Sequence, residues 1–431
     1  MADKNESFDI VVVGGGIVGL AAAYKITLSH PDVRIAVMEK EKTLCYHQTG
    51  HNSGVIHSGI YYKPGSAKAK NCTKGRKELV EFAKKYDIHH EICGKVIVAT
   101  LTKELPHLER IYNNGLENEI EGIEKISPEK IREIEPFSNG IAGIFVPCTG
   151  VIDYVKVGEK LAELIVTRDS SLVARNFESH VTRPETHEAS YNQIFLEHEV
   201  TGFDRHDFYT VVRTSQGNFS TKYIINCAGL QSDRIAKADA IWPDVRIVPF
   251  RGDFYELTNA AQEKVRHLVY PVPNPMFPFL GVHFTRMIKG NVECGPNAVF
   301  SFKREGYGKT DFDCTDARES LLYSGTWKMF FKHWLFGLGE YARVISKKLF
   351  LHSLQRLIPS LSEQDIMPGR AGVRAQAVAK NGEPADDFII EKGKNSIHVL
   401  NAPSPAATAS LAIGEYINKL ATEHFKLTNN T

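Results

Sequence analysis

The feature that most constrains the fold lies near the N-terminus, where an apolar run ends in a glycine-rich turn. Residues 8–13 are mostly β-branched, and Gly14, Gly16 and Gly19 follow in the spacing G-x-G-x-x-G at the start of an apolar, helix-like stretch. Such glycines permit a tight turn, close approach of a phosphate and close packing of helix on strand. Glu39 ends the next apolar run, where a carboxylate accepts hydrogen bonds from a ribose. A chance glycine turn is the alternative, but the strand, helix and acid together favour a dinucleotide site without a 2′-phosphate.

Composition limits the remaining possibilities. A chain of 431 residues suggests two domains, and 42% hydrophobic with 24% charged residues is ordinary for a globular protein. The net charge of +1 gives no overall attraction to nucleic acid. The seven cysteines include no CxxC pair and no zinc-like spacing, so we expect free thiols, a reducing compartment and no metal site. We also expect no membrane-spanning helix, signal peptide or transit peptide.

Three later segments favour FAD over NAD. Residues 48–54 form a polar loop of small residues after Glu39, and residues 226–229 end an apolar run with small residues. Residues 401–408 precede a last predicted helix, from about residue 406 to 420, whose N-terminus can stabilise an anionic reduced flavin. We expect noncovalent FAD, with contacts from Gly14, Gly15, Gly16, Ile17, Val18, Gly19, Glu39, Lys40, Gln48, Thr49, His51, Asn52, Ser53, Gly54, Val55, Cys227, Ala228, Gly229, Ser232, Gly372, Pro403, Ser404, Pro405, Ala406, Ala407 and Thr408.

The nucleotide-type features occur at the start, near residue 227 and at the C-terminal end, with different sequence between them. This distribution predicts an α/β protein in which an FAD-binding Rossmann-like domain is interrupted by a substrate domain with a mixed or antiparallel sheet and added helices. The FAD-binding domain is expected to comprise residues 1–92, 148–245 and 370–431. The substrate domain is expected to comprise residues 93–147 and 246–369.

Several segments resemble a known family, the FAD-dependent amino-acid and hydroxy-acid oxidoreductases of the D-amino-acid oxidase superfamily and, within it, the L-2-hydroxyglutarate dehydrogenases. They are residues 47–64 (HQTGHNSGVIHSGIYYKP), 247–253 (IVPFRGD), 277–285 (FPFLGVHFT), 295–299 (GPNAV), 372–376 (GVRAQ) and 401–408 (NAPSPAAT). The resemblance implies oxidation of L-2-hydroxyglutarate to 2-oxoglutarate by hydride transfer to flavin N5. It also implies a mitochondrial, inner-membrane location and a non-oxygen electron acceptor, either the quinone pool or a flavoprotein. Ser179 is expected on the adenine side, in a region that matches the family less clearly.

Oxidation of a 2-hydroxy acid needs a cation for the carboxylate. The planar fork of arginine suits a carboxylate, and Arg374 matches the carboxylate-binding arginine of the superfamily. A structural arginine is the alternative. Arg251 is the second candidate, although it can equally pair with Asp253.

The reaction also needs a base for the hydroxyl proton. Histidine titrates in the required range, and either His57 or His283 is expected to act, with a structural histidine as the alternative for each. The partner of the second carboxylate is left open among Tyr62, Tyr255, Thr285, Asn297 and Lys303.

Residues 326–358 form a basic amphipathic segment. Six lysines and arginines against one glutamate give a charge of +5, and two of the three tryptophans lie here. Such a helix can lie in a membrane interface. Packing of its apolar face inward is the alternative.

Two other functions remain open from the sequence. An amino-acid oxidase or dehydrogenase of the same fold would need no active-site histidine, because an amine loses its proton more readily. A non-enzymatic, FAD-containing, membrane-associated assembly protein would show a flavin spectrum that no small acid bleaches.

Overall fold

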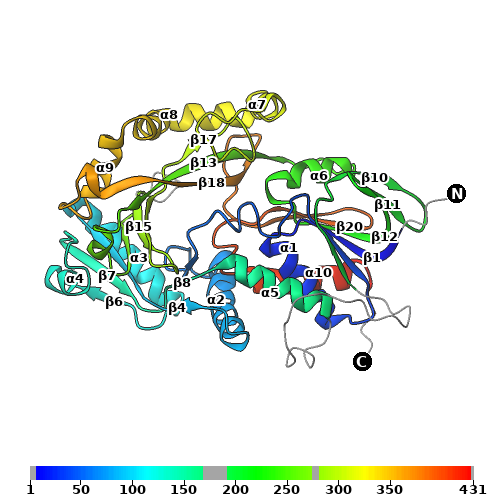
Figure 1. Cartoon of the computed structure of the whole chain (residues 1–431), viewed down its shortest axis with the longest axis horizontal. Helices are drawn as coiled ribbons and strands as arrows, with labels where there is room; N and C mark the ends of the chain where they lie inside the picture. The colour runs from blue at the N-terminus through cyan, green and yellow to red at the C-terminus, as the bar shows by residue number, and fades with distance from the viewer. Residues whose placement is uncertain (1–5, 168–191, 274–280, 429–431) are drawn as a thin grey trace.

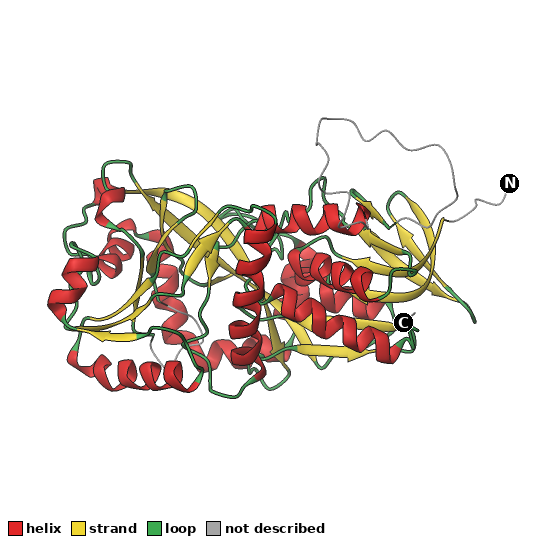
Figure 2. Ribbon diagram, turned by 90° about the horizontal axis from the view of Figure 1, so that it is seen from below, coloured by secondary structure: helices red, strands yellow, loops and turns green. Residues whose placement is uncertain are grey.

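A computed structural model describes residues 6–167, 192–273 and 281–428. Two large sheets form the two lobes of an elongated molecule, each with helices of its own (Figures 1 and 2). The chain passes between the sheets several times, so neither sheet is built from one continuous segment. The predicted fold class, an α/β protein with an interrupted Rossmann-like part and a mixed second sheet, agrees with this architecture.

The first sheet has eight strands and carries the glycine turn. The strands run in the order β10-β11-β12-β1-β2-β9, and β20 pairs with the end of β12 and with β19. They are β1 (Glu6–Val13), β2 (Ile35–Met38), β9 (Gln193–Phe195), β10 (Val200–Arg205), β11 (Thr210–Thr214), β12 (Gly217–Asn226), β19 (Ile389–Lys392) and β20 (Ser396–Asn401). Because β1 lies between parallel strands β2 and β12, its carboxyl end is the switch point at which open α/β sheets bind ligands.

Helices pack on both faces of the first sheet. They are α1 (Ile17–Ser29), α2 (Ala67–Lys85), α5 (Tyr154–Thr167), α6 (Ser232–Ala238) and α10 (Ser410–His424). Side chains alternate along β1, so Ile10 and Val12 pack with α1 and α10, while Val11 and Val13 pack on the opposite face. Both faces of β1 are therefore buried, which explains its nearly continuous apolar sequence.

The second sheet has nine strands in the order β17-β13-β16-β15-β14-β5-β7-β6, with β18 also paired to β13. They are β5 (Lys95–Ala99), β6 (Glu124–Ile126), β7 (Ala142–Val146), β13 (Val245–Leu257), β14 (Leu268–Pro271), β15 (His283–Arg286), β16 (Val292–Gly295), β17 (Val299–Phe300) and β18 (Ile366–Ala379). The pairs are antiparallel except β14 with β5. The helices of this lobe are α3 (Leu105–Glu117), α4 (Pro128–Ile134), α7 (Cys314–Leu321), α8 (Ser324–Ile345) and α9 (Lys347–Gln355).

A small three-stranded sheet lies where the chain passes between the lobes. It consists of β3 (Val55–Ile56), β8 (Gly150–Ile152) and β4 (His90–Glu91) in that order. Short 3-10 helices complete the described elements: η1 (Thr102–Glu104), η3 (Gly229–Gln231), η4 (Gln262–Lys264) and η5 (Glu363–Asp365).

Three local expectations differ from the structure. The last helix begins at Ser410 rather than near residue 406, because residues 404–409 form turns before it. The basic amphipathic segment expected as one helix over residues 326–358 lies in two helices, α8 and α9, and His333 has non-helical torsion angles inside α8. The expected boundary between residues 369 and 370 falls inside β18, whose long pairing with β13 continues across it.

Candidate active site

The three motif glycines meet three different spatial demands. Gly14 has a φ of 110°, and a Cβ there would lie 2.5 Å from the carbonyl oxygen of Cys227. A Cβ on Gly19 would lie 2.1 Å from the carbonyl oxygen of Gly14, so helix and turn are in contact. At Gly16 the nearest atom to a Cβ is Thr49 Oγ1, at 3.5 Å. Gly14 and Gly19 are therefore required by the protein itself, whereas Gly16 borders open space suited to a cofactor phosphate.

The first turn of α1 provides backbone donors beside this space. Gly16 is the N-cap and offers no side chain to the helix amides. Thr49 Oγ1 accepts a hydrogen bond from the amide of Ile17 at 3.1 Å, and the amides of Val18 and Gly19 belong to the turn that has no intrahelical acceptor. Such an end favours an anion, so the turn fits the pyrophosphate of FAD.

Glu39 is fixed at the end of β2. Its side chain is 7% exposed, and it accepts hydrogen bonds from the amides of Gly15 (2.8 Å) and Glu41 (2.9 Å). These bonds hold an acceptor beside the glycine turn, as the predicted ribose contact requires. Lys40 is engaged elsewhere, because its ammonium contacts Glu41 and, at 2.8 Å, Glu305.

The polar loop after β2 is ordered by its own hydrogen bonds. Asn52 donates to the carbonyl of Thr49 (2.6 Å) and accepts from the amide of Gly54 (2.7 Å). His51 Nδ1 lies 2.8 Å from the carbonyl oxygen of Tyr46, and its ring stacks on Tyr307. A Cβ on Gly372 would lie 2.5 Å from the carbonyl oxygen of His51, so β18 passes directly against this loop. Gln48, Ser53 and Val55 complete the predicted loop contacts.

The segments at residues 226–232 and 403–408 adjoin the same region. Asn226 accepts from the amide of Ala228 (3.1 Å), and a Cβ on Gly229 would lie 2.9 Å from Gln48 Oε1. Ser232 is fully buried and its hydroxyl donates to the carbonyl of Leu400, so this hydroxyl has a structural partner within the protein. The predicted contacts Pro403, Ser404, Pro405, Ala406 and Ala407 lie in the turns before α10.

Thr408 links the C-terminal loop to the small three-stranded sheet through residues 55–57. Its hydroxyl accepts from the amide of His57 (3.1 Å) and lies 2.8 Å from the hydroxyl of Tyr154. The Thr408 hydroxyl also donates to the carbonyl of Val55 (3.2 Å). His57 is therefore placed beside the loop that is expected to contact the flavin. Ser179, expected on the adenine side, lies outside the described residues.

Four basic side chains from separate segments form one electrostatically coupled group, here called the basic cluster. It consists of His57 after β3, Lys95 at the start of β5, His283 at the start of β15 and Arg374 in β18. Burial, followed by the charge of Lys95 and the influence of His283, lowers the pKa of His57 to about 3. Burial also lowers the pKa of His283 to about 4; the charges of Arg374 and Lys95 act in the same direction, and a hydrogen bond to Gly281 opposes them. The structure thus brings together the three residues predicted as catalytic.

The protonation states of the cluster follow from these surroundings. Both histidines are neutral at pH 7 because their pKa values lie well below it. His283 Nδ1 lies 2.8 Å from the carbonyl oxygen of Gly281, which can only accept, so Nδ1 carries the proton and Nε2 keeps a lone pair. Burial lowers the pKa of Arg374, but a guanidinium remains charged. The cluster can therefore bind an anion and accept a proton.

Several residues predicted to bind substrate have partners within the protein. Arg251 Nε donates to Asp253 at 2.9 Å and Arg251 Nη1 to the carbonyl of Gly308, which is the alternative that the sequence left open. Asn297 accepts from the amide of Asp253 at 2.8 Å. Tyr255 packs on Phe350 in the core of the second lobe. Structural roles thus account for the burial of Arg251 and Asn297 and for the partly buried position of Tyr255.

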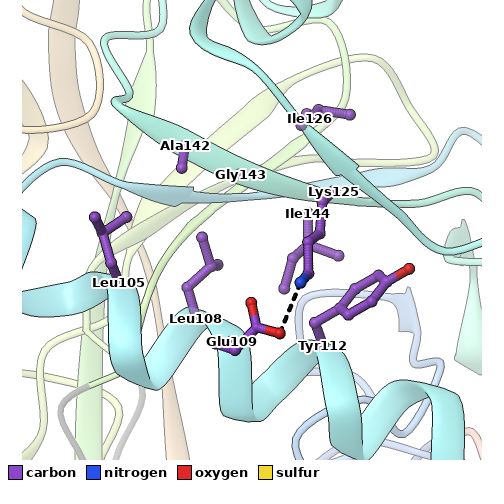
Figure 3. A pocket seen from close by; sticks show the side chains of 9 residues that line it. All are labelled: Leu105, Leu108, Glu109, Tyr112, Lys125, Ile126, Ala142, Gly143 and Ile144. Atoms are coloured by element: carbon purple, nitrogen blue, oxygen red, sulfur yellow. Dashed lines mark hydrogen bonds and ion pairs between the residues drawn. The ribbon is translucent and has the colours of Figure 1, made fainter.

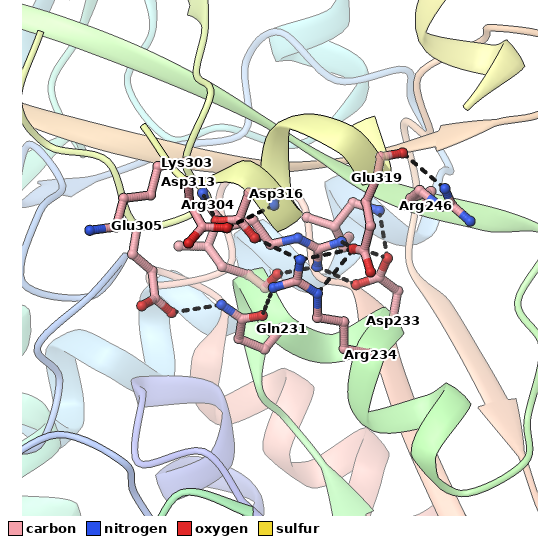
Figure 4. A network of polar contacts seen from close by, with 12 residues as sticks. Gln231, Asp233, Arg234, Arg246, Lys303, Arg304, Glu305, Asp313, Asp316 and Glu319 are labelled. Carbon is pink, nitrogen blue, oxygen red and sulfur yellow. Dashed lines mark hydrogen bonds and ion pairs between the residues drawn. The ribbon is translucent and has the colours of Figure 1, made fainter. Parts of the chain in front are cut away.

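The other three candidates for binding the second carboxylate, Thr285, Tyr62 and Lys303, lie in different parts of the structure. Thr285 is buried beside Tyr270, whose ring packs on His283 with 4.1 Å between centroids. Tyr62 lies under the ammonium of Lys68, 4.9 Å from its ring centroid. Lys303 belongs instead to the loop of a charged network (Figure 4).

That network connects the two lobes through buried charges. Arg304 is fully buried and pairs with Asp233 at the start of α6 and, at 3.3 Å, with Glu319 of α7. The adjacent Glu305 accepts from Gln231 at 2.9 Å and reaches Lys40 of the first lobe. Glu305, Glu41 and His47 lie close enough to hold a metal ion, but the Lys40 ammonium already contacts both carboxylates, so the group is an ion-pair network.

A separate hollow lies between α3 and the strands β6 and β7 (Figure 3). Its wall is mainly apolar, and its two charged residues, Glu109 and Lys125, pair with each other at 2.6 Å. No member of the basic cluster lines it. This hollow therefore lacks the convergent polar groups of a substrate site.

Sequence reasoning missed Lys95. In the sequence, Lys95 is only a lysine at the start of the apolar run 95–99. Whether its ammonium is buried near the histidines depends on which strands lie beside this run.

Comparisons with known proteins show which family the chain resembles. Residues 9–420 match the model of the FAD dependent oxidoreductase family. An L-2-hydroxyglutarate dehydrogenase of Indibacter alkaliphilus is 45% identical, covering 97% of this chain and 100% of that protein. The mitochondrial L-2-hydroxyglutarate dehydrogenase of Homo sapiens is 42% identical over 98% of this chain and 90% of its own. Among solved structures, the FAD-bound L-α-glycerophosphate oxidase of Mycoplasma pneumoniae has a TM-score of 0.73 at 24% identity, covering 99% of this chain and 97% of that one.

Proposed function

The chain belongs to the FAD dependent oxidoreductase family and, within it, to the L-2-hydroxyglutarate dehydrogenases, and from this membership we propose that it oxidises L-2-hydroxyglutarate to 2-oxoglutarate. FAD is the cofactor of the family; when bound, it accepts the hydride that leaves the substrate Cα. We propose that it is held noncovalently by the glycine turn, the α1 amides and Glu39.

The observation that carries the proposal is the basic cluster. A guanidinium, an ammonium and two neutral histidines share one buried region, in which the opposite charge of Glu340 acts on Arg374. A dianionic substrate would bring one carboxylate for each of the two cations. Arg374 would hold the α-carboxylate through its planar fork.

His283 is the proposed base. Its Nδ1 is committed to the carbonyl of Gly281, so Nε2 is free to accept the hydroxyl proton as the carbonyl of the product forms. Its ring is held against Tyr270, which fixes the direction of that lone pair. His57 would then orient the substrate beside the loop that contains Thr408.

Anaerobic stopped-flow bleaching of the flavin tests the reaction. The panel contains both enantiomers of 2-hydroxyglutarate, shorter 2-hydroxy acids and amino acids. We expect bleaching fastest with L-2-hydroxyglutarate. Faster bleaching by an amino acid would identify the activity as that of an amino-acid oxidase or dehydrogenase, and no bleaching by any acid would favour the non-enzymatic alternative.

We further propose that α8 and α9 rest on a membrane surface. Helices α8 and α9 lie along the outer edge of the second lobe (Figure 1). Seven large apolar side chains of these helices, here called the apolar stripe, are exposed at intervals of three or four residues: Trp327, Phe331, Trp334, Leu338, Tyr341, Ile345 and Leu349. Met329 and Phe350 pack inward, so these helices have both an inner and an outer apolar face. Lysines beside the stripe favour anionic lipid.

No helix in the described part of the chain is long and apolar enough to cross a bilayer. The proposed attachment is therefore along one face. The mammalian relatives are described as mitochondrial, and we propose the inner mitochondrial membrane as the location and the quinone pool as the acceptor. Steady-state reduction of a short-chain quinone tests the acceptor, and cell fractionation of the full chain tests the location. An enzyme that is found in the soluble fraction and does not reduce the quinone would refute both assignments.

Vesicle sedimentation tests the membrane face directly. Phe331 and Ile345 are 74% and 85% exposed, and we expect the double variant Phe331→Glu/Ile345→Glu to reduce binding to vesicles of phosphatidylcholine and phosphatidylglycerol by roughly tenfold or more. Phe208, 90% exposed in the turn between β10 and β11, provides the matched control Phe208→Glu. Equal binding of the double variant and the control would contradict the proposal.

A further inference from the structure

Lys95 is an ammonium buried in the second sheet. It is the first residue of β5, where it pairs with Leu268 of β14 on one side and Val146 of β7 on the other. Its exposed fraction is 1%. A lysine so deeply buried is rare unless a partner compensates its charge.

The groups around Lys95 do not supply that compensation. Its Nζ lies over the rings of Tyr61 (4.6 Å from the centroid) and Tyr270 (5.2 Å), which attract a cation only weakly. Among the described residues, no carboxylate forms an ion pair with it. Cys72 is nearby, but burial raises the pKa of that thiol to about 12, so it is neutral. Burial lowers the pKa of Lys95 to about 8, as expected for an ammonium that no carboxylate of the described residues contacts.

A second polar group in the same place also lacks a partner. The hydroxyl of Tyr61 is buried, and no described residue hydrogen-bonds to it. Burial raises the pKa of Tyr61 well above its ordinary value, so this hydroxyl keeps its proton as a donor. The ammonium of Lys95 thus lies over the ring that bears this hydroxyl, and among the described residues the ammonium has no carboxylate partner and the hydroxyl no hydrogen-bond partner. The charge of Lys95 also acts on both histidines of the basic cluster.

We propose that Lys95, assisted by Tyr61, binds the distal carboxylate of a dicarboxylate substrate and so determines the enzyme's preference for dicarboxylic over monocarboxylic acids. The inference rests on the proposed function, in which Arg374 holds the α-carboxylate. The cluster then contains one cation for each carboxylate, and the charges of both cations act on His283, the proposed base. Lys95 acts by direct contact, so it determines specificity and takes no part in proton transfer.

Binding of inert acids to the FAD-loaded enzyme tests this role without turnover. Glutarate and pentanoate have five carbons each and differ in one carboxylate; their dissociation constants follow from the change in the flavin spectrum. We expect Lys95→Met to weaken glutarate binding by roughly 10- to 100-fold, the value of a charge-assisted hydrogen bond. Binding of pentanoate should change by less than about twofold. Lys95→Gln keeps a polar side chain and gives the same test if the methionine variant does not fold.

Two further variants sharpen the result. Tyr61→Phe should weaken glutarate alone, by roughly fivefold. Lys125→Met removes a half-exposed lysine of β6 that pairs with Glu109 in a hollow that no member of the basic cluster lines, and both acids should bind as to the wild type.

An unchanged ratio of glutarate to pentanoate affinity in both Lys95 variants, or no glutarate preference in the wild type, would overturn the proposal. A role restricted to keeping the histidines neutral would give that outcome, since it alters the pH profile alone. Because glutarate is not oxidised, the test is independent of the reaction. Loss of glutarate preference in an enzyme that L-2-hydroxyglutarate does not bleach would support the Lys95 site and refute the proposed reaction.

Discussion

The two sheets contribute to the site by different physical means. At the carboxyl end of β1 the first sheet presents backbone: glycines, helix amides and one carboxylate, Glu39, that amides hold in place. The second sheet presents charged or titratable side chains, with Lys95, His283 and Arg374 placed on three of its strands. In the proposed function, recognition of FAD by the first region depends on available space and partial charges, whereas recognition of the substrate by the second depends on full charges in a buried setting. Substitutions should therefore act through shape in the first and through charge and protonation in the second.

The largest effect should come from filling space in the first region. In Gly16→Val the new side chain meets no protein atom closer than 3.5 Å at Cβ, but it occupies the space expected for the pyrophosphate. We expect FAD affinity to fall by roughly 100-fold or more, which is about 3 kcal/mol, while the apoprotein keeps its fold. Flavin fluorescence on dialysis measures the affinity and circular dichroism the fold.

Two related variants make this result specific. Gly337→Val in α8 is the matched control, because nothing lies within 4 Å of its Cβ, and FAD binding should be unchanged. Gly14→Ala should lose folding stability and FAD together, because its Cβ meets the Cys227 carbonyl at 2.5 Å and its φ is 110°. Normal FAD binding by Gly16→Val would show that the phosphates lie elsewhere.

The first region was predictable because its chemistry is contiguous in sequence. The strand, turn and helix around Gly14 and the acid at Glu39 lie within about forty residues, and each glycine has a role that spacing alone specifies. The spacing could not reveal which glycines are required by contacts within the protein and which one borders open space. That only Gly16 borders open space follows from where Cys227 and Thr49 come to lie, and both belong to other segments.

Replacement of His283, the proposed base, should produce the next largest effect. We expect His283→Gln to lower kcat by roughly 100- to 10,000-fold with FAD retained. Because the active form is the neutral imidazole, and burial lowers its pKa to about 4, the wild-type kcat/KM should stay level from neutral pH to about pH 5 and fall below that. The variant should lose this acid limb. A larger loss in His57→Gln than in His283→Gln would reassign the base to His57.

A smaller effect is expected where charge is kept and geometry is lost. Arg374→Lys retains a cation but not the planar fork, so KM for L-2-hydroxyglutarate should rise by roughly 10- to 100-fold while kcat and the flavin spectrum change little. Steady-state kinetics with a matched Arg251→Lys variant measures the contrast. Arg251 already pairs with Asp253, so its replacement should affect thermal stability more than KM. An unchanged KM in Arg374→Lys would show that Arg374 does not bind the substrate carboxylate.

The second region was only partly predictable because its residues come from distant segments. His57, His283 and Arg374 were recognisable from residue type and family resemblance, but their neighbours depend on strand register. Lys95 joins them because β5 lies beside β14, and that parallel pairing joins segments about 170 residues apart. Arg251 looked equally suitable in sequence, yet the partner two residues away occupies it. A buried charge is thus recognisable as functional only when its partners, or the lack of them, are known.

The smallest effect, a change with pH, separates Lys95 from every other group in the cluster. The titratable groups that face it are Tyr61, Tyr270, His57, His283, Cys72 and Cys148. Both histidines are neutral above about pH 4, and burial raises the pKa of each tyrosine and each thiol above its ordinary value. Lys95, with a pKa lowered to about 8, is therefore the group that loses charge near that pH.

The affinity of the holoenzyme for glutarate should accordingly be constant from pH 6 to 7 and weaken above about pH 8, by up to roughly tenfold per pH unit, as the ammonium deprotonates. Pentanoate affinity should stay level across the same range, since Arg374 remains charged. In Lys95→Met the two acids should show the same pH dependence. A parallel decline of both acids in the wild type would place the titrating group at the α-carboxylate end and contradict the assignment of one cation to each end of the substrate.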